Sequence, residues 1–198
     1  MEGSSKILAF IGHEGSGKNT AANEIYQMIE KSNKPTVTSE FAFANPLKMI
    51  ANTSLNITMD QSEFLKRNPN IKVANNLDIR EYYNTLGDVL KRNFGDDIFR
   101  DRTIISMQEL IDTLESITYI ITDVRYPQEV DALKIFAAKN NIPLYFIKMV
   151  KTGDVININL DAHESVINID KLDYDFLVDA KNPEEIKIKM EIILNELY

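Results

Sequence analysis

The sequence of 198 residues contains no cysteine and no tryptophan, and only 2 of its residues are histidines. Without cysteine the chain can form neither disulfides nor metal sites with thiolate ligands, and cysteine-based nucleophilic catalysis is excluded as well. A chain without cysteine fits a reducing compartment. We therefore expect the protein in the cytoplasm, which is the host cytoplasm if the chain is viral.

Long apolar runs are also lacking. No stretch approaches the ~20 apolar residues that a membrane-spanning helix needs, and no basic region with a long apolar core marks a signal peptide near the start. The net charge of −8 argues against binding to nucleic acid or to anionic membranes. The partners that we expect are small-molecule nucleotides rather than a nucleic-acid polymer or a membrane, and homodimerisation stays an open alternative.

Arginine is scarce and unevenly placed. All six arginines lie between residues 67 and 125, and the rest of the chain uses only lysine as its strong cation. The planar guanidinium group binds phosphate in a bidentate manner, whereas lysine acts as a point charge. The clustering therefore indicates a phosphate-binding region, with a solvated helix face as the alternative.

Three of the 7 glycines fall in one short loop, "IGHEGSGKNT" at residues 11–20, which follows the apolar run "KILAF". Glycines in such a loop let successive backbone N–H groups point inward, and the helix that follows adds its positive end. Lys18 can then reach the β- and γ-phosphates of a nucleotide. We predict a triphosphate site formed by Gly12, Gly15, Ser16, Gly17, Lys18, Asn19 and Thr20.

In a phosphate-binding loop of the form G-x-x-x-x-G-K, the residue after the lysine is usually Ser or Thr, but here it is Asn19. Either its amide oxygen approaches a Mg²⁺ ion, or Thr20 supplies a hydroxyl group while the metal keeps mostly water and phosphate ligands. The sequence "GKNT" resembles the "GKGT" of nucleoside monophosphate kinases, which favours Thr20.

Alternating strand and helix patterns predict an α/β fold of three layers, with a five-stranded parallel sheet between helices. We expect strands at 6–11, 36–44, 117–122, 143–150 and 174–178, and helices at 17–31, 46–55, 78–94, 102–115, 127–140 and from 183 onwards. Residues 57–77 are polar, and we expect them to be irregular. The whole chain, 1–198, then forms one domain that carries a helical insertion at 45–116, which is longer than a single crossover needs.

Four further stretches, taken in order with the loop, resemble the deoxynucleoside monophosphate kinases of bacteriophages and their bacterial relatives. They are "FAFANPLKMIA", "IREYYNTLGDVLKRNFGDDIF", "ITDVRYPQEVDALK" and "AHESVINIDKLDYDFLVDAKNPEEI". The resemblance runs from about residue 6 to the C-terminus and implies a P-loop kinase that uses ATP and Mg²⁺. The sequence differs from the family pattern at Asn45, Asn84, Asp88, Val89, Phe99 and Val166. We therefore do not transfer the family's contacts to the nucleotide base to this chain.

The resemblance also implies roles for individual residues. The catalytic residues that it implies are Lys18, Asp123 and Arg125, with Thr20 and Asp123 near the metal, the latter through water. The acceptor-binding residues that it implies are Lys48, Arg80, Arg92, Asp97, Arg125 and His163. Several have a simpler alternative. Arg125 could pair with Glu129, Asp123 could cap a turn, Lys48 could be a surface lysine, and His163 could be an ordinary loop residue. Of Arg80 and Arg92, which need not share a helix face, one could pack structurally.

We therefore expect the protein to phosphorylate deoxynucleoside monophosphates to diphosphates, a step of nucleotide biosynthesis. The chemistry needs no nucleophilic side chain, because the acceptor phosphate is itself the nucleophile. One alternative is another small-metabolite kinase, similar to phosphomevalonate kinase or dephospho-coenzyme A kinase. The other is a nucleotide-binding switch without turnover.

Overall fold

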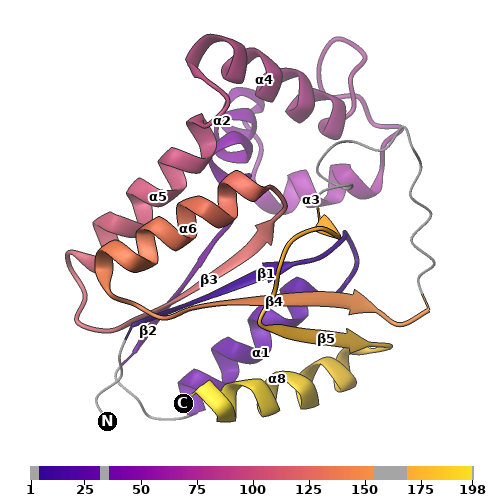
Figure 1. Ribbon diagram of the computed structural model, residues 1–198. Coiled ribbons are helices and arrows are strands. Elements are labelled where there is room, and N and C mark those ends of the chain that lie inside the picture. The colour runs from indigo at the N-terminus through magenta and orange to yellow at the C-terminus, as the bar shows by residue number, and fades with distance from the viewer. Residues whose placement is uncertain (1–4, 32–35, 154–168, 198) are drawn as a thin grey trace. The chain divides into compact units, whose positions relative to one another are not determined.

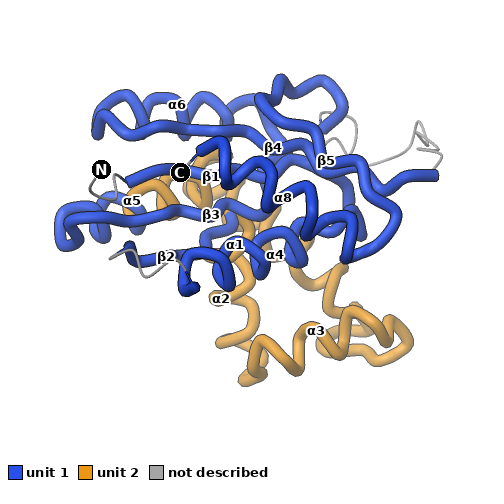
Figure 2. The backbone as a smooth tube through the Cα atoms, turned by 90° about the horizontal axis from the view of Figure 1, so that it is seen from below, with its two compact units in different colours: residues 1–42, 106–198 blue, residues 43–105 orange. Residues whose placement is uncertain are grey.

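A computed structural model describes residues 5–31, 36–153 and 169–197 (Figure 1). The chain divides into two compact units, which Figure 2 colours separately. The first unit contains residues 1–42 and 106–198, and the second contains residues 43–105. Among the described residues, no helix is both long and apolar enough to cross a membrane.

The first unit is built on a sheet of five parallel strands in the order β2-β3-β1-β4-β5, which confirms the predicted sheet. The strands are β1 (Lys6–Ile11), β2 (Val37–Phe41), β3 (Ile117–Val124), β4 (Leu144–Lys151) and β5 (Phe176–Ala180). Every residue of β1 is buried, because this strand lies in the middle of the sheet and helices cover both of its faces.

Helices lie on both faces of this sheet (Figure 1). On one face, α1 (Lys18–Lys31) and α8 (Pro183–Leu197) pack onto the strands. This core contains Leu8, Phe10, Ala21, Ala22, Ile25, Ile120, Ile147, Met149, Ile186 and Met190, among others. On the other face lies α6 (Pro127–Asn140), and its Phe136 ring meets the buried Tyr119 ring edge-on at 5.7 Å. The three-layer α/β/α class is therefore confirmed.

The strand register decides which residues meet at the carboxyl end of the sheet. Ile11 at the end of β1 pairs with Val124 at the end of β3. The loop that follows β1 and the turn that follows β3 therefore leave the sheet side by side. In open α/β sheets, ligands bind at this edge.

The second unit is helical. Its helices are α2 (Asn45–Leu55), α3 (Met59–Arg67) and α4 (Ile79–Phe94), and α5 (Ile98–Ile111) begins in this unit and ends in the first. Ala51, Ile79 and Tyr83 form its small apolar core. The buried Asn52 accepts a hydrogen bond of 2.7 Å from the Tyr83 hydroxyl group, which joins α2 to α4.

Two expectations for this region were wrong. Residues 57–77 are not irregular throughout, because α3 occupies Met59–Arg67 and begins with a capping box between Thr58 and Gln61. Helix α5 begins at Ile98 and ends at Ile111, four residues earlier than the predicted 102–115. Its first turn is held by Arg100, which donates to Asp97 at 2.7 Å and to Asp101 at 2.8 Å.

Candidate phosphate-binding site

The glycine-rich loop joins β1 to α1 and is closely packed against its neighbours. A Cβ atom on Gly12 would lie 2.6 Å from the carbonyl oxygen of Met149 on β4. Gly17 has φ +90°, and a Cβ atom there would collide with Ile186 of α8. A side chain at position 12 would meet the backbone of β4 and push the loop away from the sheet. At position 17 the positive φ itself favours glycine, and a side chain would also displace the tip of Ile186.

Lys18 is the first residue of α1, and its side chain folds back into the loop. Its Nζ atom donates to the carbonyl oxygens of Gly12 at 2.7 Å and His13 at 2.6 Å, and lies 3.4 Å from Ser16 Oγ. The Ser16 amide also donates to the His13 carbonyl, at 3.2 Å. Lys18 and Ser16 are both buried, so the loop encloses the ammonium group.

Asp123 and Arg125, at the end of β3, act electrostatically on this ammonium group. Burial and, after it, the charge of Arg125 lower the pKa of Lys18 to about 8, against the opposing effect of the carboxylates of Asp123 and Glu14. The structure therefore gathers Lys18, Asp123 and Arg125, three of the residues predicted from the sequence, around one end of the sheet.

The guanidinium group of Arg125 is not fully satisfied. Its Nε atom is buried and has no hydrogen-bond partner among the described residues. Buried polar atoms without partners are rare in proteins, and each calls for an explanation such as a bound ion.

Glu129, which the sequence suggested only as an ion-pair partner of Arg125, contacts the backbone. Its Oε2 atom accepts from the amide of Arg125 at 2.7 Å and from that of Tyr126 at 3.0 Å. Burial and, after it, the nearby charge of Asp123 raise its pKa to about 7, against the opposing effect of the two amides and the Arg125 charge. Pro127 at the start of α6 and a glutamate two residues later are a helix-start signal from which this contact could have been expected.

A second charged cluster lies beside the loop and was not predicted. Asp170 Oδ1 lies 3.4 Å from His13 Nε2 and 3.7 Å from Lys148 Nζ. Lys148 Nζ also lies 5.5 Å from the centre of the Tyr174 ring and 3.3 Å from the Asp170 carbonyl oxygen. His13 is 157 residues from Asp170 in the sequence, so no local pattern indicates this contact.

The residues that the sequence predicts near Mg²⁺ are Thr20 and Asp123. Thr20 is half-buried in the first turn of α1, and Asn19 is exposed. Among the described residues, no group of three or more His, Asp and Glu side chains could hold a metal ion. A few hard oxygen ligands fit Mg²⁺, because this ion usually keeps several waters and binds phosphate oxygens.

The remaining predicted residues lie in the second unit or outside the described residues. Within the second unit, Lys48 is half-buried on α2 and Arg80 and Arg92 are exposed on α4. Asp97 pairs with Arg100 at 2.7 Å, a contact that the sequence reasoning did not expect. His163 lies outside the described residues.

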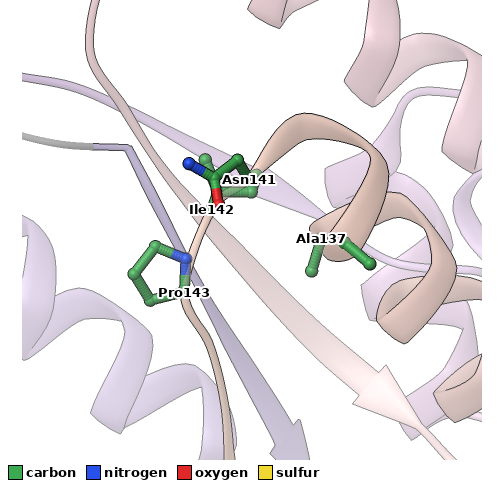
Figure 3. Close-up of a pocket in the computed structure, with 5 residues that line it drawn as sticks. Ala137, Asn141, Ile142 and Pro143 are labelled. Atoms are coloured by element: carbon green, nitrogen blue, oxygen red, sulfur yellow. The ribbon is translucent and has the colours of Figure 1, made fainter.

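A shallow hollow at the opposite end of the strands is not a candidate site (Figure 3). It lies where α6 ends and β4 begins, and its lining residues are Ala137, Ala138, Asn141, Ile142 and Pro143. The Pro143 carbonyl oxygen accepts from Ile7 near the start of β1, which places the hollow at the amino end of the sheet. None of its side chains is ionisable.

The fold is a three-layer α/β/α sandwich with a glycine loop and a lysine between β1 and α1. It is similar to that of APS kinase from Mycobacterium tuberculosis in complex with AMPPNP and APS, with a TM-score of 0.50, 12% identity and 98% of each chain covered. A cysteine-to-alanine variant of that enzyme matches with a TM-score of 0.48, 13% identity and 98% of each chain covered.

Shikimate kinase from Aquifex aeolicus matches with a TM-score of 0.44 and 11% identity over 96% of this chain and 97% of that chain. By sequence, no protein-family model and no curated protein matches the chain. At these identities the likeness extends to the fold, and the substrate has to be argued from the site.

Proposed function

We propose that this protein is a small-molecule kinase that transfers the γ-phosphate of ATP to a deoxynucleoside monophosphate. One observation carries the proposal: the cations Lys18 and Arg125 lie close enough at the glycine loop that the charge of Arg125 lowers the pKa of Lys18. Like charges in a partly buried site are unfavourable by themselves, and a polyanion between them turns this cost into a gain. A nucleotide triphosphate is such a polyanion.

Each residue of the site then has a role in phosphoryl transfer. The backbone amides of residues 12–18 surround the β-phosphate, and Lys18 binds the β- and γ-phosphates. Arg125, whose Nε is buried without a partner, binds the phosphate that is transferred or the one that accepts it. Because charge spreads over the phosphoryl oxygens in the transition state, cations held in place stabilise it more than they stabilise the bound substrates.

Mg²⁺ would be held by the Thr20 hydroxyl group and, through water, by the Asp123 carboxylate. It supplies neutralisation of the charge on the phosphate oxygens when it is bound. The charge of Asp123 already acts on Lys18, so this carboxylate lies close enough to influence the same ligand.

The acceptor site is proposed for the second unit. The resemblance to deoxynucleoside monophosphate kinases assigns it Lys48, Arg80, Arg92 and Asp97, with His163 from the C-terminal part. Lys48 lies near the start of α2. Against the effect of burial, the hydrogen bond and charge of Lys66 lower the pKa of Glu63 on α3, and the charge of Lys48 adds to them, so Lys48 is close to another helix of the same unit. Of the cations in this unit, we assign Lys48, Arg80 and Arg92 to the phosphate of a monophosphate acceptor.

A second candidate is a kinase for another small metabolite. The fold supports it equally, since the similar structures include an APS kinase, and the loop chemistry does not depend on the acceptor. The acceptor must therefore be found by experiment.

The test is a coupled assay of ADP release with Mg-ATP and a panel of acceptors. The panel contains dAMP, dGMP, dCMP, dTMP and modified pyrimidine monophosphates, with phosphomevalonate, dephospho-coenzyme A and APS as rivals. Turnover with one or more deoxynucleoside monophosphates supports the proposal. Turnover only with a rival assigns the second candidate, and ATP binding without ADP release for any acceptor would indicate a binding protein.

Arg125→Ala tests the carrying observation directly. We expect kcat to fall by a factor of about 10³ or more, because the variant lacks a phosphate-binding guanidinium group. Lys18→Ala should abolish turnover. Arg67→Ala removes an exposed arginine from α3, which we assign no role, and serves as the control. A near-normal kcat in Arg125→Ala would remove this residue from the site.

A further inference from the structure

Glu129 makes one more contact than a helix cap needs. In an ordinary capping box, a glutamate at the third helical position accepts from the backbone amide of the cap residue. Glu129 does this with Tyr126 at 3.0 Å, and the same oxygen also accepts from the amide of Arg125 at 2.7 Å. The extra bond fixes the residue before the cap, which helix formation does not require.

The carboxyl group of Glu129 is in an unfavourable environment for a charge. Only 8% of the residue is exposed, and the charge of Asp123 lies nearby. An exposed cap would avoid this desolvation. The buried carboxylate of Glu129 instead stabilises the turn between β3 and α6 by accepting from the amides of Arg125 and Tyr126.

The side chain of Arg125 has little else to hold it. Its Nε atom is buried and lacks a partner among the described residues. The direction of the guanidinium group therefore depends on the backbone conformation of Arg125. That conformation is held on one side by β3, whose Val124 pairs with Ile11, and on the other by Glu129.

We propose that Glu129 is a positioning residue, which fixes the backbone of Arg125 so that its guanidinium group faces the loop around Lys18. This inference rests on the proposed function for its effect on catalysis. Its structural part, the control of Arg125 by Glu129, does not depend on which acceptor is used.

The test compares Glu129→Ala, which removes the acceptor atom, with Glu129→Gln, which keeps an oxygen of the same reach. The matched control is Gln61→Ala, which removes the third-position acceptor of the capping box of α3. The first readout is the Nε–H signal of Arg125 in ¹H–¹⁵N spectra, which can be assigned by its loss in Arg125→Lys because the chain has only six arginines. The second is kcat and KM for the acceptor found, with the Kd of AMPPNP.

In Glu129→Ala we expect the Nε–H signal of Arg125 to shift and to exchange faster with water. We expect kcat to fall about 100-fold, as for a reacting group displaced by about 1 Å. The Kd of AMPPNP should change by no more than about threefold, because the loop around Lys18 is intact. Glu129→Gln should restore the signal and most of kcat, and Gln61→Ala should leave both unchanged.

An Arg125 signal that is unchanged in folded Glu129→Ala would overturn the inference, whatever the acceptor. If the signal moves but no acceptor is phosphorylated by the wild-type protein, the proposed function fails while the structural part stands. If Glu129→Ala does not fold, Glu129→Asp takes its place, because a side chain shorter by one methylene cannot reach both amides. A signal and kcat in Glu129→Asp equal to those of the wild type would then refute the inference.

Discussion

The pKa of Lys18 leads to a prediction about pH and nucleotide affinity. Burial and the charge of Arg125 lower this pKa from 10.5 to about 8. Only the protonated ammonium group attracts phosphate oxygens. The affinity for a nucleotide must therefore fall as the pH rises above the pKa of the free site.

The magnitude follows from the proton equilibrium. Above the pKa, each pH unit reduces the protonated fraction tenfold, so affinity at about pH 9 should be roughly tenfold below its plateau, and at about pH 10 roughly 100-fold below it. The measurement is the Kd of AMPPNP by calorimetry between about pH 6 and pH 10. Lys18→Arg is the matched control, because its guanidinium group keeps its charge over this whole range.

The free energy of unfolding should change in the opposite direction. The unfolded lysine keeps its proton up to about pH 10.5, and the folded one loses it near pH 8. Between these values the unfolded state binds more protons, so the ligand-free protein becomes more stable as the pH rises, by up to roughly 3 kcal/mol. An AMPPNP affinity that stays flat up to about pH 10, or that falls equally in Lys18→Arg, would refute the assignment of this pKa to Lys18.

Three other substitutions test other parts of the structure. In thermal unfolding, Gly17→Ala should lower the free energy of unfolding by more than Gly153→Ala does. Both glycines have φ +90°, but only at Gly17 would a Cβ atom meet a neighbour. Equal losses of stability would contradict the close contact with α8. The free energy of unfolding of the wild-type protein should fall as the pH rises from about 4.5 to about 7, because in this range the folded state still holds the proton of Glu129 and the unfolded state has lost it. Glu129→Gln should remove this pH dependence. A pH dependence that survives in Glu129→Gln would belong to another group. Tyr83→Phe should lower the free energy of unfolding by about 1–3 kcal/mol in chemical denaturation, because the side-chain oxygen of the buried Asn52 loses the hydroxyl group that donates to it at 2.7 Å. An unchanged free energy of unfolding would mean that this oxygen finds another donor.

The two central strands were predictable because they are apolar and buried. The runs at 6–11 and 117–122 indicate strands without reference to distant residues, and they correspond to β1 and β3. Helix α3 was missed for the opposite reason, since it has few apolar residues and only one of its residues, Ser62, is buried. Its start signal, Thr58 followed by Gln61, was present in the sequence but is weak when no apolar face accompanies it.

In the candidate site too, some residues were predictable from the local sequence and others depend on contacts between distant residues. Lys18 could be predicted because its loop is continuous in sequence, and Asp123 and Arg125 because they end a buried strand. The contact of His13 with Asp170 joins residues far apart, and it depends on how the segment before β5 packs against the loop. The second bond of Glu129 was hidden because a sequence pattern indicates a cap, not the number of amides that one oxygen accepts.

The contact between Gly17 and Ile186 links the beginning of the chain to its last described helix. The buried side chains of α8 pack on α1 and the sheet, and Ile186 lies directly against the loop backbone. During synthesis the loop emerges early, but the surface that supports it emerges only with residues 183–197. The loop that we propose to bind nucleotide is therefore supported on this side only once α8 has emerged, and we expect a ribosome-bound chain that lacks α8 to bind ATP less tightly than the full chain.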